Sequence, residues 1–347
     1  MIEFKDLNVL ITGGLGFIGS NLAENLVKHG SYVTCVDSLI PEYGGNTYNV
    51  SEIKSKIDIN IADIRDQFSM NHIVKDKDII FNLAGQTSHL DSMEDPLTDL
   101  DINCRSQITI LEACKNYNPN VKIVFASTRQ IYGKPIYLPV DENHPIQPID
   151  VNGINKFAGE SYHILYHNVY GINSTVLRLT NTFGQKMRIK DSKQTFLGIW
   201  LRNVLENKPI CIYGDGNQKR CFSYIDDVIY CLEKLALDKK ISKEIINIGP
   251  DEETITINEL ARLVANETGY NGQPIYVPGR PKEVSVASCS SDKARDLLQY
   301  KTRTSLKDSV KLTADYIRKK GVKNFVYNLP VEIKSDITPE TWTKKTI

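Results

Sequence analysis

The chain has 347 residues, of which 41% are hydrophobic and 24% charged, as expected for a globular protein with a sizeable core. Its 42 basic and 42 acidic residues cancel, so no net charge favours nucleic acid or an anionic membrane as a partner. No apolar run reaches the ~20 residues of a membrane span, no signal peptide is visible, and the seven cysteines lack metal or CxxC spacing, so we expect a cytoplasmic protein with buried thiols and no metal.

Short apolar runs alternate with longer helical patterns along the first half of the chain. The predicted strands cover residues 8–11, 32–36, 78–82, 121–126 and 174–179, and the predicted helices cover residues 17–28, 96–117 and 154–170. Strands that alternate with helices predict a parallel sheet covered on both faces. Right-handed crossovers then make this α/β fold a doubly wound, Rossmann-type sheet.

The rhythm of the sequence weakens after about residue 180. Helical patterns continue at residues 196–206, 225–237 and 257–268, but polar loops separate them. We therefore expect a Rossmann domain over residues 1–180 and a smaller C-terminal α/β lobe over residues 181–320, with some interleaving of the chain. The polar stretch 321–347 is interpreted as a tail.

A glycine-rich turn connects the first predicted strand to the first predicted helix. Gly13, Gly16 and Gly19 have GxxGxxG spacing, which permits a tight turn, a close approach of pyrophosphate and close packing of the helix on the sheet. The helix start offers free N–H groups to phosphate. Asp37, at the end of the second strand, can accept both hydroxyls of the adenosine ribose and would repel a 2′-phosphate. The pattern predicts a site for NAD rather than NADP.

Further motifs follow this turn in a fixed order. They are Asp63-Ile64, Asn82-Leu83-Ala84-Gly85-Gln86, Asp95-Pro96 with Asn103, Ser127-Thr128-Arg129-Gln130-Ile131-Tyr132-Gly133, Lys156-Phe157-Ala158-Gly159-Glu160, Arg178-Leu179-Thr180-Asn181-Thr182-Phe183-Gly184, and Gly214-Asp215-Gly216 with Arg220. In this combination the chain resembles the extended short-chain dehydrogenase/reductase family of sugar-nucleotide epimerases and dehydratases. The resemblance covers roughly residues 7 to 317.

The resemblance implies a set of residues for the cofactor and another for a nucleotide-diphosphate sugar. The implied NAD-binding residues are Gly13, Gly16, Phe17, Ile18, Gly19, Asp37, Asp63, Ile64, Leu83, Ala84, Gln86, Asn103 and Lys156. Asn181, Arg220 and Arg280 are implied to contact the substrate diphosphate, where guanidinium groups can pair phosphate oxygens bidentately. Family members commonly form homodimers through the helices read here as 96–117 and 152–170.

The family's YxxxK motif is altered in this chain. Lys156 is present, but Asn152 stands where the tyrosine acts as acid and base on the sugar hydroxyl. An amide has no accessible pKa and cannot be a general base near neutral pH. Thr128, Tyr132, His89, a water held by Lys156 or Lys156 itself are candidates for moving the proton, although a loop histidine such as His89 more often has a structural role. Assistance by the substrate, or slow or absent turnover, are further interpretations.

Arg129 and Gln130 occupy the positions at which the family's 4,6-dehydratases typically place an acidic pair. Neither side chain can supply the acid or base of that elimination at neutral pH, which disfavours dehydration. We therefore expect an NAD-dependent epimerase that removes and returns hydride at a sugar carbon, with C4 as the expected position and Thr128, Lys156 and Asn152 in the catalytic region. The alternatives are a nucleotide-sugar dehydrogenase, reductase or dehydratase, or a non-catalytic protein that binds NAD and nucleotide sugar.

Overall fold

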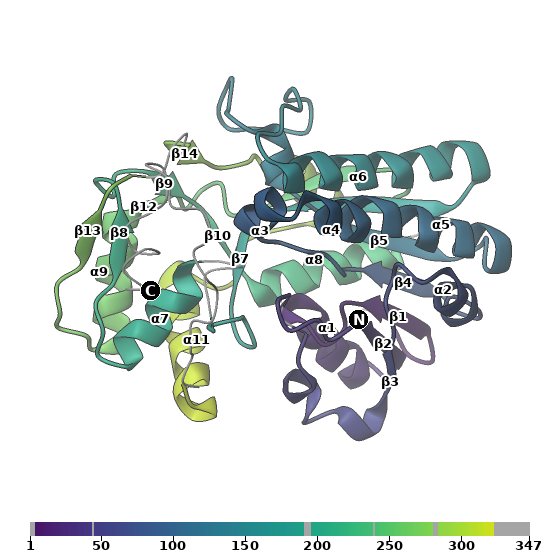
Figure 1. Ribbon diagram of the computed structural model, residues 1–347, viewed down its shortest axis with the longest axis horizontal. Helices are drawn as coiled ribbons and strands as arrows, with labels where there is room; N and C mark the ends of the chain where they lie inside the picture. The colour runs from purple at the N-terminus through teal and green to yellow at the C-terminus, as the bar shows by residue number, and fades with distance from the viewer. Residues whose placement is uncertain (1–3, 44, 191–195, 239, 280–283, 323–347) are drawn as a thin grey trace.

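A computed structural model describes residues 4–43, 45–190, 196–238, 240–279 and 284–322 (Figure 1). Its centre is a seven-stranded sheet in which every neighbouring pair of strands is parallel. From one edge to the other the strands are β3 (Ile57–Ile61), β2 (Tyr32–Asp37), β1 (Asn8–Thr12), β4 (Ile79–Asn82), β5 (Lys122–Thr128), β6 (Asn173–Leu179) and β11 (Ile245–Ile248). The order reverses between β1 and β4, which is where a doubly wound sheet opens its ligand crevice.

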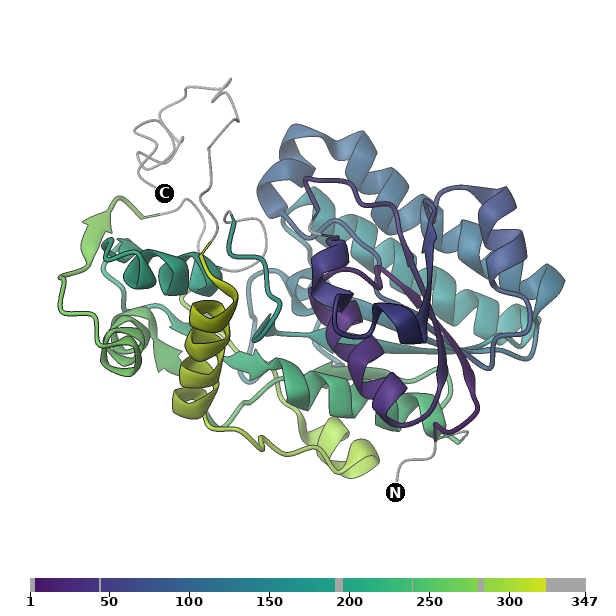
Figure 2. The same cartoon turned by 90° about the horizontal axis from the view of Figure 1, so that it is seen from below.

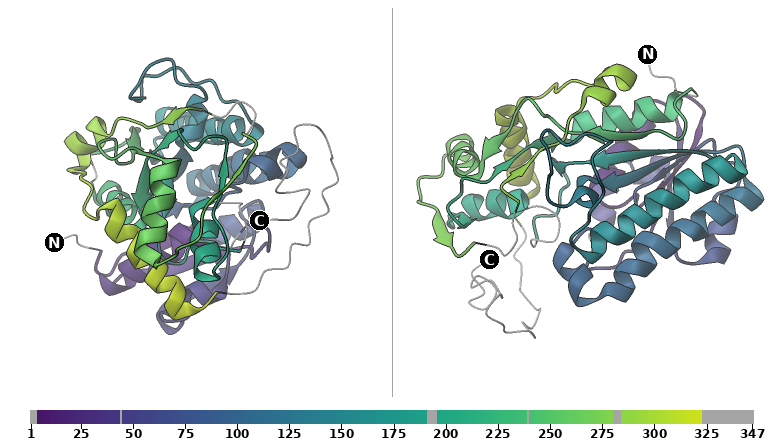
Figure 3. Two further views of the ribbon diagram at one scale, coloured as in Figure 1. Left: turned by 90° about the vertical axis from the view of Figure 1, so that its left-hand side faces the viewer. Right: turned by 90° about the horizontal axis from the view of Figure 1, so that it is seen from above.

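Helices cover both faces of this sheet (Figures 1 and 3). One face carries α2 (Gln67–Ile73), α4 (Pro96–Leu100), α5 (Ser106–Tyr117) and α6 (Val151–Tyr170), and the other carries α1 (Phe17–Lys28) and α8 (Ile225–Leu237). Alternate residues of β1 point to opposite faces. Leu10 therefore belongs to the apolar cluster under α5 and α6, and Val9 and Ile11 belong to the cluster that includes α1 and α8.

The smaller lobe lies beside the carboxyl ends of the strands (Figure 2). Its short strands are β7 (Asn181–Phe183), β8 (Cys211–Tyr213), β9 (Lys219–Arg220), β10 (Phe222–Tyr224), β12 (Ile255–Thr256), β13 (Ile275–Val277) and β14 (Val286–Ala287). Its helices include α7 (Phe196–Leu205), α9 (Ile257–Thr268) and α11 (Leu306–Lys320). A capping box between Thr256 and Glu259 starts α9, and Gly269 ends it in the left-handed conformation.

The structure confirms the doubly wound α/β fold, and the predicted limits of α1, α8 and α9 are those observed. The helix predicted at 96–117 is present but contains a π-helical turn, Asp101–Arg105. The start predicted for the helix at 154 was wrong, because α6 begins at Val151, where the side chain of Asp150 caps it. Strand β11 comes from the range assigned to the lobe and completes the Rossmann sheet, so the chain interleaves. The domain limits themselves stay a prediction.

Three of the sequence expectations concern the cysteines, membrane spans and metal sites. All seven cysteines are buried and unpaired. In the described ranges, no helix combines the length and apolar character needed to cross a membrane, and no group of three or more His, Cys, Asp or Glu side chains is placed to hold a metal ion.

Candidate functional site

A cavity of about 260 Å³ opens at the carboxyl ends of β1, β2, β4, β5 and β6. Most of the predicted cofactor residues line it: Gly13, Gly16, Phe17, Ile18, Gly19, Asp37, Asp63, Ile64, Leu83, Ala84, Gln86 and Lys156. Thr128, Asn152 and Asn181 line the same cavity. Residues from seven separate sequence motifs therefore meet around one space.

The glycine turn has the geometry of a pyrophosphate cradle. Gly13 has φ +67°, and a Cβ on Gly19 would collide with the carbonyl oxygen of Gly13. No side chain caps the start of α1, and its first turn contains no acidic residue. The first N–H groups of the helix are therefore available to an anion, favoured by the helix dipole. These features fit the diphosphate of a dinucleotide.

Two acidic residues, Asp37 and Asp63, line the cavity. Asp37 lies at the end of β2, where its carboxylate accepts hydrogen bonds from the backbone N–H of Leu15 (3.1 Å) and of Leu39 (3.0 Å). Asp63 follows β3 and is paired with Arg65, which leaves it ionised because the hydrogen bonds from Arg65 outweigh burial and lower its pKa. The fixed carboxylate of Asp37 is suited to accept hydrogen bonds from ribose hydroxyls, which NAD has and which NADP lacks at its 2′ position.

Lys156 lies on α6 at the other end of the cavity. Its Nζ is 3.5 Å from the carbonyl oxygen of Ala126 and 5.4 Å from the centre of the Phe125 ring. A Cβ on Gly85 would lie only 2.7 Å from this Nζ, so a larger residue there would displace the end of the lysine side chain. Burial lowers the pKa of Lys156 to about 8, although the charge of Asp99 opposes the shift. The ammonium is therefore weakly solvated and available to a ligand in the cavity.

Asn103 does not line the cavity but lies directly behind it, on the π-helical turn. Its Nδ2 donates to the backbone carbonyl of Gln86 (2.9 Å) and to Asp99 (3.0 Å). Its buried Oδ1 has no hydrogen-bond partner among the described residues and faces the Cβ position of Gly85 at 3.0 Å. π-Helical turns are frequent at functional sites. This one places the Oδ1 of Asn103 behind the cavity wall, beside Lys156.

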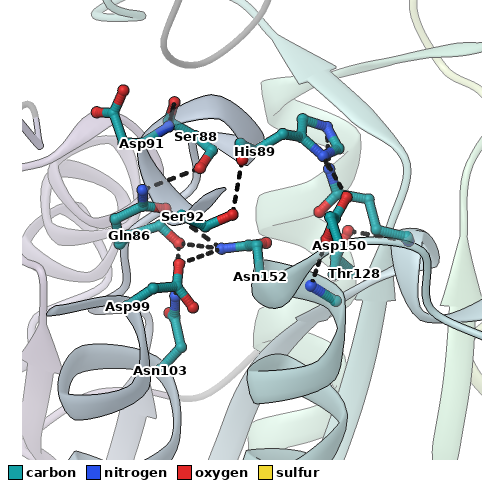
Figure 4. Close-up of polar contacts among 12 residues, drawn as sticks. Gln86, Ser88, His89, Asp91, Ser92, Asp99, Asn103, Thr128, Asp150 and Asn152 are labelled. Carbon is teal, nitrogen blue, oxygen red and sulfur yellow. Dashed lines mark hydrogen bonds and ion pairs between the residues drawn. The ribbon is translucent and has the colours of Figure 1, made fainter. Parts of the chain in front are cut away.

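Asn152, at the position of the missing tyrosine, is 2% exposed and belongs to a hydrogen-bonded network (Figure 4). Its Nδ2 donates to the carbonyl oxygen of Gln86 (2.9 Å), to the Oε1 of Gln86 (3.2 Å) and to Asp99 Oδ2 (3.0 Å). Asp99 also accepts from Asn155 (2.8 Å). The amide nitrogen of Asn152 therefore holds the cavity wall together by satisfying a fully buried carboxylate.

Thr128 ends β5 and caps the short 3-10 turn that follows, where its Oγ1 accepts from the backbone N–H of Gln130 (3.2 Å). Tyr132, the tyrosine nearest to this motif, is fully buried. Its hydroxyl accepts from Arg178 (2.6 Å) and donates to Asn247 (2.8 Å), and burial raises its pKa. Tyr132 is thus a core residue, which removes it from the candidates for proton transfer.

Of the three residues predicted to contact the substrate diphosphate, only Asn181 is seen, within the described ranges, to line the cavity. Asn181 begins β7 and lines the cavity. Arg220 lies on β9, is not among the residues that line the cavity, and donates from Nη1 to the backbone carbonyl of Lys219 (2.8 Å). Arg280 lies outside the described residues. Asp99, Asn155 and Asp150 also belong to this region, and no motif in the sequence marks them.

Comparisons with known proteins agree with this geometry. The model of the NAD-dependent epimerase/dehydratase family matches residues 9–249. A putative UDP-glucose 4-epimerase of Methanocaldococcus jannaschii is 37% identical over 313 residues, which are 89% of this chain and 98% of that protein. The UDP-glucose 4-epimerase of Thermotoga maritima, solved with UDP-glucose, is 31% identical with a TM-score of 0.84, covering 90% of this chain and 99% of that one.

A third relative was solved with the cofactor. The UDP-glucose 4-epimerase of Thermus thermophilus in complex with NAD is 29% identical, with a TM-score of 0.80, covering 90% of this chain and 99% of that one. The glycine turn, the carboxylate after β2, the lysine of α6 and the extent of these matches lead to one conclusion. The chain belongs to the NAD-dependent epimerase/dehydratase family.

Proposed function

We propose that this protein is an NAD-dependent epimerase of a UDP-sugar, which inverts the sugar at C4. The observation that carries the proposal is that the pyrophosphate cradle, Thr128, Lys156 and Asn181 line one cavity. When bound, NAD supplies the hydride acceptor and donor. The UDP-sugar is proposed from the relatives, because two of the three described above are UDP-glucose 4-epimerases and the third is a putative one.

The residues of the cavity have separate roles in this proposal. The ammonium of Lys156 holds the nicotinamide ribose, and its charge favours the alkoxide that develops on the sugar. The hydroxyl of Thr128 binds the reacting sugar hydroxyl. Asn181, with Arg220 and Arg280, takes the diphosphate of the substrate. Asn152 keeps the wall beside Lys156 in place through Asp99.

The presence of Arg129 and Gln130, where an acidic pair would be needed for dehydration, favours epimerisation. Both follow Thr128 on the turn Arg129–Tyr132, and Gln130 lines the cavity. A carboxamide at this position cannot remove a proton from the sugar ring. An epimerase that removes hydride and returns it does not need a base that takes a proton from a carbon of the sugar ring.

The proposal is tested on the purified chain. Released nucleotide is identified after denaturation, and the native protein is incubated with UDP-, GDP-, CDP- and dTDP-sugars. We expect bound NAD, interconversion of UDP-glucose and UDP-galactose, and no net NADH. Net NADH would identify a dehydrogenase instead. Binding of NAD and UDP-glucose without conversion of any sugar would contradict the proposal in favour of a binding protein.

A homodimer is part of the proposal. Helices α4 and α6 share the outer side of the sheet, and large apolar side chains on them are exposed: Leu97, Leu100, Ile154, Leu165, Val169 and Tyr170. A second copy packed on this side would remove that apolar surface from water. Light scattering after gel filtration measures the mass, and a Leu165→Glu variant should shift it from dimer towards monomer. The cytoplasmic location stays a prediction.

A further inference from the structure

A histidine–aspartate pair lies beside the Thr128 end of the cavity (Figure 4). His89 is the first residue of α3 (His89–Glu94), and its Nδ1 is 2.7 Å from Asp150 Oδ2. The two residues are far apart in sequence and meet because α3 packs on α6. The imidazole is 54% exposed, whereas the carboxylate of Asp150 is only 14% exposed.

Asp150 is held in place independently of the histidine. It is the N-cap of α6, and its Oδ1 accepts from the backbone N–H of Gly153 at 2.7 Å. Burial of Asp150 opposes its ionisation, but the hydrogen bond and charge of His89, together with the hydrogen bond from Gly153, lower its pKa. A fixed carboxylate on Nδ1 orients the ring and leaves Nε2 as its exchangeable nitrogen, which is the arrangement of an oriented general base.

Gln130 connects this pair to the cavity. Its Nε2 is 3.1 Å from His89 Nδ1 and is also in contact with His89 Nε2, and its backbone N–H donates to Thr128 Oγ1. Gln130, Thr128 and Asn152 all line the cavity. The Nε2 of His89 therefore meets a side chain that faces the same space as the proposed sugar-binding threonine.

We propose that His89 is the catalytic acid and base of the reaction, that Asp150 positions it, and that the pair takes over the role of the tyrosine that Asn152 replaces. This inference rests on the proposed epimerase function. Two other candidates are already engaged: Tyr132 is in the core, and Lys156 is assigned to the cofactor ribose.

The proton of the sugar hydroxyl moves to His89 and back in this step. The sugar hydroxyl displaces the Gln130 amide from His89 Nε2. As the C–H bond gives its hydride to NAD, the O–H bond breaks and a new Nε2–H bond forms, so the imidazole becomes an imidazolium stabilised by Asp150. Return of hydride to the other face of the carbonyl carbon reverses the transfer, and Nε2 gives the proton back to the oxygen.

The pH dependence of this step is set by the groups around His89. Asp150 contacts it directly, and further charges lie on α3 and on the two helices packed against it, namely Asp91 and Glu94 on α3, Asp99 on α4 and Lys156 on α6. A base must be neutral to accept the proton. We therefore expect kcat to fall when the pH is lowered far enough to protonate the base.

The test compares His89→Gln with His72→Gln, the same substitution at an exposed histidine on α2. With UDP-glucose, His89→Gln should lower kcat at least about 100-fold, the usual contribution of a general base, with little change in KM or in bound NAD. The acid limb of the kcat profile should disappear with it. Asp150→Asn should keep the α6 cap but lower kcat, because asparagine caps helices well and lacks the charge.

A second readout does not depend on turnover. In ¹⁵N-histidine spectra, the Nε2 signal assigned with His89→Gln should move when UDP-glucose is added, and the His72 signal should not. Activity of His89→Gln within about threefold of wild type, or an unmoved Nε2 signal, would overturn the assignment to His89 and leave the epimerase proposal standing. A wild-type chain that converts none of the tested sugars would overturn both.

Discussion

Replacing Asn152 by leucine, which has nearly the same size, tests whether this residue holds the cavity wall. The variant removes three hydrogen bonds from Nδ2, one of which goes to the fully buried carboxylate of Asp99. Asn103 and Asn155 still donate to Asp99, so the carboxylate keeps part of its stabilisation. A hydrogen bond to a charged group contributes about 1.5–3 kcal/mol, and we expect the free energy of unfolding to fall by that amount.

Urea denaturation monitored by circular dichroism measures this loss. The control is Asn168→Leu, an exposed position on the same helix, which should change the free energy of unfolding by less than about 0.5 kcal/mol. Equal stability of Asn152→Leu and Asn168→Leu would refute the structural role of Asn152. Asn152→Tyr provides a further comparison, because a large gain in kcat from the restored tyrosine would indicate a degraded active site and contradict a working replacement base.

Two further predictions concern the cofactor. Gly19→Ala places a Cβ against the Gly13 carbonyl and should weaken NAD binding at least about tenfold by calorimetry, a loss of about 1.4 kcal/mol, whereas Gly279→Ala, whose Cβ would lie 3.6 Å from its nearest neighbour, should not. The pKa of Lys156 is lowered to about 8, so its charge is lost as pH rises through that value, and NAD binding should weaken there in wild type but not in Lys156→Met. A pH-independent affinity in wild type would contradict this role.

The sequence predicted the Rossmann sheet well because its determinants are local. The glycine turn, the apolar run of β1 and the amphipathic α1 lie within 21 residues of one another, and each has a physical signature in the sequence. Strand β3 was missed because only Ile57 and Ile59 of its five residues are even partly buried, so no apolar run marks it. Strand β11 was missed because its place in the sheet depends on pairing with β6, across more than 60 residues of the lobe.

The predicted cofactor residues come together around one cavity, whereas the polar contacts behind that cavity have no motif in the sequence. Motif spacing predicted the glycine turn, Asp37 and Lys156, because each belongs to a short segment whose spacing is visible in the sequence. The network around Asn152 and the pairing of His89 with Asp150 could not be read from spacing, because they depend on how α3 and α4 pack on α6. The one available signal was Asp150 three residues before Gly153, an N-cap pattern that would also have placed the start of α6 correctly.

The fate of the hydrogen on the reacting carbon tests the central claim most directly. UDP-glucose carrying deuterium at C4 of the glucose is incubated in ordinary water with the purified protein and no added cofactor, and the product is examined by NMR and mass spectrometry. We expect UDP-galactose that keeps the deuterium at C4, with no NADH released. Loss of the deuterium to water, or NADH formed in proportion to product, would contradict removal and return of hydride within one NAD-binding cavity.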